Sequence, residues 1–117
     1  MKSLKSISVY FFREVSGNEP VRKWLQGLND EDRKIIGKDI RIVQTDWPTG
    51  LPLVRSMGNK LWEIRSDLDN RIARTFFILH KGSIVLLHGI IKKSQKTPVN
   101  DLELANKRAK KVMSEEL

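Results

Sequence analysis

Positively charged side chains are the chemically active groups of this sequence, and they cluster in its second half. Between Asn70 and Asn100 there is no aspartate or glutamate, but there are six lysine and arginine residues: Arg71, Arg74, Lys81, Lys92, Lys93 and Lys96. Apolar residues such as Phe76, Ile84 and Ile90 are interleaved with them, so we expect these cations on the surface of a packed β-sheet. Guanidinium and ammonium groups bind phosphate oxygens and stabilise the charge that develops during phosphodiester cleavage.

Other common catalytic and ligand-binding patterns are missing from the sequence. It has no cysteine, which excludes a disulfide framework and a thiolate metal site. Its two histidines, His80 and His88, have no acidic neighbours at metal-ligand spacing, and we interpret His88 as a histidine that packs in the sheet. There is no glycine-rich phosphate loop, nucleophile elbow or dinucleotide-binding motif. We therefore predict no metal site and no small-molecule cofactor.

The length and net charge of the chain limit its organisation and its partners. We predict a single domain, 1–117, because 117 residues suffice for one hydrophobic core. The net charge of +8 at pH 7 favours a polyanionic partner, with nucleic acid first and an acidic protein second. No apolar run approaches the roughly 20 residues that cross a bilayer, and no signal peptide is visible. We expect a cytoplasmic protein without a membrane segment.

Hydrophobic periodicity predicts a strand and two helices in the first half of the chain. Alternating side chains predict a strand at residues 7–12. Apolar residues three and four positions apart then predict a short helix capped by Asn18, with Pro20 in its first turn. A longer helix is predicted to begin after Asn29, which caps it, and to end at Pro48.

Short turns divide the following segment into antiparallel strands. Three strands are expected, at residues 61–66, 71–80 and 83–93. The last of them is apolar on both faces, so we expect it inside the sheet. Thr97 as N-cap and Pro98 as first residue predict a final helix. The predicted fold is α+β, with a strand and two helices followed by a three- to four-stranded antiparallel meander and a C-terminal helix.

The order of these elements, together with several motifs, resembles the RelE/ParE toxin superfamily, and within it the phage-derived HigB-like toxins of type II toxin–antitoxin systems. The motifs are LWEIR at 61–65, RIARTFF at 71–77 and LLHGIIKKSQKTP at 86–98, followed by a basic helix. The resemblance covers nearly the whole chain and is densest from Leu61 to Ala109. It implies a metal-independent endoribonuclease that cuts mRNA on the ribosome. It also implies a helix-turn-helix antitoxin, HigA-like, as the neutralising partner.

The same resemblance implies roles for individual cations. Arg74 matches the arginine that contacts the scissile phosphate, Lys93 a basic residue that stabilises the transition state, and Arg65 the basic position of the LWEIR strand. Successive strand residues point to opposite faces, so only one residue of the Lys92–Lys93 pair faces the site, and we favour Lys93. As surface cations, Arg74 and Lys93 should be removable without loss of the fold. Four further cations are expected to bind the RNA backbone: Lys92, Lys96, Arg71 and Lys107.

Two departures from the RelE pattern leave the proton-transfer groups open. RelE uses a C-terminal tyrosine, whereas the only tyrosine here is Tyr10, in the first predicted strand; Glu63 occupies a position that is basic in RelE. Two other functions therefore stay open: a ParE-like protein that inhibits a topoisomerase without catalysis, and a plain RNA-binding module. The presence of Arg65, Arg74 and the Lys92–Lys93 pair favours the nuclease.

Overall fold

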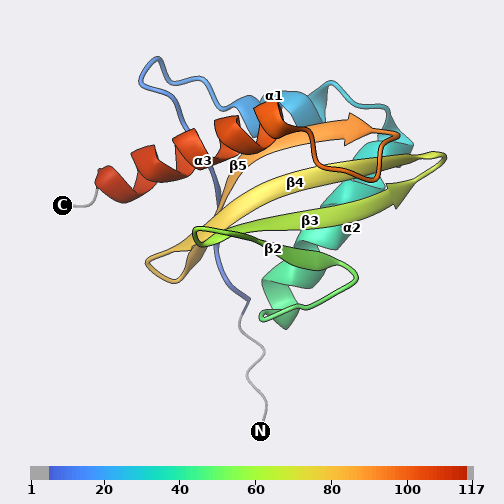
Figure 1. The fold of residues 1–117 in the computed structure, drawn as a ribbon, viewed down its shortest axis with the longest axis horizontal. Coiled ribbons are helices and arrows are strands. Elements are labelled where there is room, and N and C mark those ends of the chain that lie inside the picture. Colours follow the sequence, from blue (N-terminus) through green and yellow to red (C-terminus); the bar gives the residue numbers. More distant parts are fainter. Residues whose placement is uncertain (1–5, 116–117) are drawn as a thin grey trace, which may run out of the picture.

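A five-stranded mixed sheet with helices on both faces forms the framework of the chain (Figure 1). The computed structural model describes residues 6–115. The strands lie in the order β1-β5-β4-β3-β2, and their bounds are β1 Val9–Phe11, β2 Val54–Gly58, β3 Leu61–Leu68, β4 Arg71–His80 and β5 Ser83–Lys92. One face is covered by α1 and α2 and the other by α3, with bounds α1 Pro20–Gln26, α2 Asp30–Asp46 and α3 Val99–Ser114.

The structure confirms the predicted α+β class and enlarges the predicted sheet at both edges. Strands β2 to β5 form an antiparallel meander, with β2 as its outer strand. The first strand pairs in parallel with β5, with Val9 opposite Ile84 and Phe11 opposite Leu86. The sequence did not indicate this parallel pair. The predicted position of β5 inside the sheet is confirmed, because β5 lies between β1 and β4.

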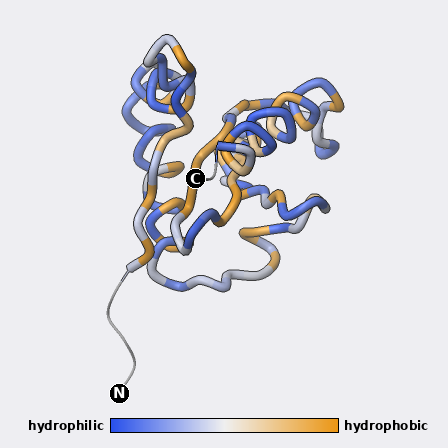
Figure 2. The backbone as a smooth tube through the Cα atoms, turned by 90° about the vertical axis from the view of Figure 1, so that its left-hand side faces the viewer, coloured by the Kyte–Doolittle hydropathy of each residue, from blue (hydrophilic) through white to orange (hydrophobic). Residues whose placement is uncertain are grey.

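Alternation along the strands divides the hydrophobic residues between two cores. On β4, Phe77 belongs to the core under α1 and α2, whereas Phe76 belongs to the core under α3. Trp47 makes edge contacts with Trp62 and Phe77 at centroid distances of 5.0 and 5.6 Å, as expected for tryptophans that pack in the core. Figure 2 shows hydrophobic residues along the strands between the two helical layers.

Gly89 on β5 allows α1 to lie directly on the sheet. A Cβ atom at this position would lie 2.2 Å from the ring of Trp24, far inside van der Waals contact. The absence of a side chain at Gly89 thus fixes how closely α1 approaches β5.

Two of the predicted helix caps are wrong and one is confirmed. Asn29 caps α2 by accepting a hydrogen bond from the backbone N–H of Asp32 at 2.8 Å. Asn18 instead donates to a carboxylate oxygen of Glu14 at 2.7 Å, and α1 begins one residue later. The N-cap of α3 is Pro98 and not Thr97, because the Thr97 hydroxyl donates to a buried carboxylate described below.

Within residues 6–115, no helix combines the length and the hydrophobicity needed to span a membrane.

Candidate functional site

Arg74, the arginine assigned to the scissile phosphate, has a fully buried side chain. The strand register places it opposite Arg65 on β3 and Ile90 on β5, on the sheet face that carries α3. Its Nη2 donates a hydrogen bond of 2.6 Å to the backbone carbonyl of Ser94, in the loop of residues 93–98 between β5 and α3. The expectation that Arg74 is a surface cation is therefore wrong, because this loop and the sheet enclose it.

A buried carboxylate accompanies this buried arginine. Glu63 on β3 is fully buried, and its Oε2 lies 3.5 Å from Nε of Arg74. The Thr97 hydroxyl donates to the same oxygen at 2.6 Å, and an Nη2 donor of Arg55 on β2 lies 3.3 Å from Oε1. Buried ions are stable only when charge partners and hydrogen bonds compensate their lost hydration. Glu63 thus joins Arg55, Arg74 and the 93–98 loop into one network.

Positively charged side chains outnumber negatively charged ones around Arg74. Burial lowers the pKa of the Arg74 guanidinium from its ordinary value, the charge of Glu63 acts in the opposite direction, and Arg65 and Arg55 lower the pKa further. Arginine nevertheless stays protonated in proteins. In the part of the chain that the structure describes, Nε and Nη1 of Arg74 have no hydrogen-bond partner. One carboxylate therefore faces three guanidinium groups.

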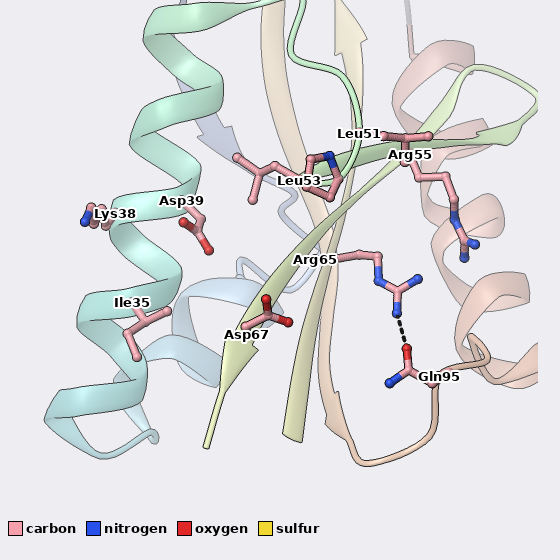
Figure 3. A pocket seen from close by; sticks show the side chains of 10 residues that line it. Ile35, Lys38, Asp39, Leu51, Leu53, Arg55, Arg65, Asp67 and Gln95 are labelled. Atoms are coloured by element: carbon pink, nitrogen blue, oxygen red, sulfur yellow. Dashed lines mark hydrogen bonds between the residues drawn. The ribbon is translucent and has the colours of Figure 1, made fainter. Parts of the chain in front are cut away.

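Arg65 and Arg55 are the accessible arginines of this region. Arg65 is half-buried, and its Nη2 donates to the side-chain oxygen of Gln95 at 3.1 Å (Figure 3). The side chain of Arg55 is 39% exposed. Arg55 was not among the predicted site residues because it precedes the acid-free segment. The Gly58-Asn59 turn before LWEIR was the available signal, since a hairpin there implies an earlier strand that carries Arg55.

Lysines at the end of β5 lie at the edge of the site that contains Arg65 and Arg74. Lys92 lies opposite Ile72, so the alternation of strand residues places Lys92, and not Lys93, on the sheet face of Arg74. Lys93 follows the last residue of the strand and lines a small hollow together with Arg65 and Gln95. Lys92, Lys93 and Lys96 are exposed, and none of the ion pairs found within residues 6–115 involves them.

Arg71, expected to bind RNA, is instead paired with a residue of α2. Its two terminal nitrogens donate to the two carboxylate oxygens of Asp32 at 2.8 and 3.0 Å. This bidentate pair holds the start of α2 to the β3–β4 hairpin, on the face away from Arg74. The hydrogen bond from Arg71 is the main cause that lowers the pKa of Asp32 below its ordinary value, with burial acting against it.

The Asp32–Arg71 pair predicts a stability difference that depends on pH. Because the folded-state pKa of Asp32 is lowered, the pair stabilises the protein above the unfolded-state pKa of about 4, and the contribution is lost as the pH falls through the lowered value. Asp32→Asn should therefore be less stable than wild type at pH 7, and the difference should shrink in acid. Urea denaturation midpoints of both proteins between pH 7 and pH 3 measure this stability difference. Asp46→Asn is the control variant. A stability difference between wild type and Asp32→Asn that stays constant over this pH range would contradict the prediction.

Within residues 6–115, neither Lys107 nor His88 makes a hydrogen bond to Arg55, Arg65 or Arg74. Lys107 is exposed on α3, about 12 Å along the helix axis from its first residue. His88 has Nε2 2.7 Å from a carboxylate oxygen of Asp101 and Nδ1 3.5 Å from Nη1 of Arg108, and its ring stacks on Phe76. Both ring nitrogens thus have partners, as expected for a histidine that packs in the sheet. Nothing in residues 6–115 groups three or more metal-ligating side chains of the His, Cys, Asp or Glu type.

The fold and the site define a class of protein: a small α+β protein whose antiparallel meander carries a cluster of cations suited to bind phosphate groups. A sequence profile of the family described as "Phage derived protein Gp49-like" matches residues 23–110. The chain therefore belongs to the Gp49-like family, a family of phage-derived proteins associated with RelE- and HigB-like toxins of toxin–antitoxin systems. No curated protein matches the sequence significantly.

Proposed function

We propose that this protein is the HigB-like toxin of a toxin–antitoxin pair and that it cleaves mRNA on the ribosome. The observation that carries the proposal is the group of exposed or half-exposed cations around the 93–98 loop: Arg55, Arg65, Lys92, Lys93 and Lys96. Membership of the Gp49-like family supports the toxin class. A ribosome-bound substrate places the reaction in the cytoplasm.

The proposed reaction needs positive charge and alignment. The 2′-hydroxyl oxygen of the RNA attacks the adjacent phosphorus, the bond from phosphorus to the 5′-oxygen breaks, and the products carry a 2′,3′-cyclic phosphate and a 5′-hydroxyl. Water accepts the proton from the attacking hydroxyl and supplies one to the leaving oxygen. Arg65 and Lys93 bind the non-bridging oxygens and stabilise the charge of the transition state, a role that no metal ion is needed to fill. The ribosome aligns the mRNA.

Arg74 has a positioning role in this mechanism. It is enclosed and does not contact RNA in this conformation, but its charge holds Glu63 and the Ser94 carbonyl in place. Through these contacts it fixes Arg55 and the 93–98 loop, which carries Lys93 and Lys96. We therefore assign Arg65 and Lys93 to the substrate and Arg74 to the network that orients them, with Lys92 and Lys96 as contacts to the RNA backbone.

One observation favours a non-enzymatic toxin as the second candidate. An arginine that contacts a phosphate must be accessible, and the arginine that matches the family's clamp is fully buried. A ParE-like inhibitor of a topoisomerase would use the same cations to bind an acidic protein surface and would leave RNA intact.

A cleavage assay on translating ribosomes separates the two candidates. The purified protein is added to a translating extract supplied with one transcript, and the 5′ ends of the fragments are mapped by primer extension. The nuclease should produce new ends, and 3′ fragments isolated from the reaction should carry a 5′-hydroxyl that polynucleotide kinase labels. Intact transcripts together with inhibition of growth on expression would favour the topoisomerase inhibitor.

The proposed antitoxin should bind with a rate that depends on salt. A helix-turn-helix antitoxin that covers the cationic site needs an acidic segment, and exposed charges steer such a partner only within the Debye length, about 10 Å at 0.1 M salt. We expect the association rate to fall at least tenfold between roughly 0.05 and 0.5 M salt. Stopped-flow fluorescence with the purified antitoxin measures this rate. A rate constant that salt leaves unchanged would indicate an apolar interface elsewhere.

A further inference from the structure

A hollow of about 830 Å³ opens beside the cationic site, between α2 and β3 (Figure 3). The pairing of β3 with β2 ends at Ile64, opposite Val54, and the backbone N–H of the next residue, Arg65, donates to the Leu53 carbonyl at 2.8 Å. This α2–β3 hollow has three kinds of charged or apolar lining: the cations Lys38, Arg55 and Arg65, the carboxylates of Asp39 and Asp67, and apolar side chains that include Leu51 and Leu53. Its volume accommodates a nucleotide.

Arg65 stands between this hollow and a second one. A smaller hollow of about 370 Å³ is lined by Lys93 and, in common with the first, by Arg65, Asp67 and Gln95. A phosphate held by Arg65 would therefore have space for one nucleotide on each side. This is the arrangement that a single-stranded RNA needs in order to pass the proposed cleavage site with its bases splayed apart.

The two carboxylates of the larger hollow have no partner in the part of the chain that the structure describes. Neither Asp39 nor Asp67 takes part in any of its ion pairs or side-chain hydrogen bonds, and Figure 3 shows both within the hollow. Carboxylates repel RNA phosphates, so they weaken a site that binds only the backbone. They do, however, accept hydrogen bonds from base N–H groups, as carboxylates do when proteins bind base edges.

We propose that the α2–β3 hollow binds the base next to the scissile phosphate and that Asp67 selects guanine there. Guanine presents two parallel donors, N1–H and the N2 amine, which match the two oxygens of one carboxylate. Each of the other three bases presents one donor beside an acceptor that a carboxylate repels. Asp67 lies two residues from Arg65 on the same strand and face, so it lies beside a nucleotide whose phosphate Arg65 holds. Leu51 and Leu53 supply the apolar wall for the base.

This inference rests on the proposed function for the identity of its ligand, RNA. Two measurements distinguish a failure of the inference from a failure of the proposed function. The first maps cleavage sites in the translating extract for wild type and Asp67→Asn. The second measures binding of short 2′-O-methyl oligonucleotides, which cannot be cleaved, that differ only in one central base: guanine, adenine, cytosine, uracil or hypoxanthine. The control variant is Asp69→Asn, the same change two residues away and outside the lining of both hollows.

We expect wild type and Asp69→Asn to prefer guanine about tenfold over the other standard bases, since a bidentate contact discriminates at this level or above. Hypoxanthine lacks the N2 amine and should bind with intermediate affinity. Asp67→Asn should keep its melting temperature and lose the preference. A guanine preference in binding without any RNA cleavage would refute the proposed function and leave this inference standing. The inference would be overturned if wild type cleaves or binds RNA without a preference for guanine. It would also be overturned if Asp67→Asn keeps that preference.

Discussion

Arg65→Ala should slow the cleavage of ribosome-bound mRNA by about 10² to 10³-fold while the protein stays folded. Loss of one donor that stabilises transition-state charge costs this much in enzymes that act through electrostatics. The only side-chain hydrogen bond of Arg65 within residues 6–115 goes to the partly exposed loop at Gln95, so its removal uncovers no buried charge. The rate of fragment formation from one transcript, measured by primer extension, gives the effect.

Two further variants show whether this loss is specific to the site. Lys110→Ala on α3 removes the same unit of charge from an exposed position outside the site and should stay within about twofold of wild type. Arg65→Lys keeps the charge but loses the planar fork that binds two phosphate oxygens, so it should lie between wild type and Arg65→Ala. Equal rates for Arg65→Ala and Lys110→Ala would show that Arg65 does not contact the reacting phosphate.

Arg74→Ala should lower the free energy of unfolding by about 3 kcal/mol, because it leaves Glu63 buried with fewer compensating charges. Glu63 would keep Arg55 and Thr97, whereas the Ser94 carbonyl would lose its donor. Urea denaturation followed by circular dichroism measures the change. Loss of toxicity in Arg74→Ala would then reflect an unstable fold and a displaced 93–98 loop.

Matched variants isolate the contribution of the buried pair. Lys93→Ala removes an exposed cation and should change the unfolding free energy by less than about 0.5 kcal/mol. Adding Glu63→Gln to Arg74→Ala should recover part of the lost stability, because the uncompensated buried charge is gone. A stability of Arg74→Ala within about 0.5 kcal/mol of wild type would contradict the buried network.

Local signals predicted most of the fold, and the missing parts depend on contacts distant in sequence. The cap at Asn29 and the turn at Lys81-Gly82 are encoded by a few adjacent residues, so α2 and the β4–β5 hairpin were predicted nearly to the residue. The pairing of β1 with β5 joins residues more than seventy positions apart, such as Val9 and Ile84. No local pattern distinguishes that parallel pair from an unpaired strand.

The sequence indicated a cluster of cations, but it did not indicate which of their side chains are buried. The absence of acidic residues from Asn70 to Asn100 indicated where cations gather. The burial of Arg74 could not be inferred, because it results from Glu63 on the neighbouring strand and from a loop that folds back from the end of β5. The face of Lys92 likewise depends on the register with Ile72, which is set by the β4–β5 pairing and its irregularity near Phe76.

Primer extension on one transcript, with and without translating ribosomes, tests the proposed function most directly. The chain supplies cations for the phosphate, but the described residues provide no free histidine beside them, since His88 is held by Asp101 and Arg108. We therefore predict discrete cuts in the mRNA on ribosomes and at least 100-fold slower cleavage of the free transcript. Equal cleavage in both reactions would contradict ribosome dependence, and no cleavage in either by a protein that still stops growth would contradict the nuclease itself.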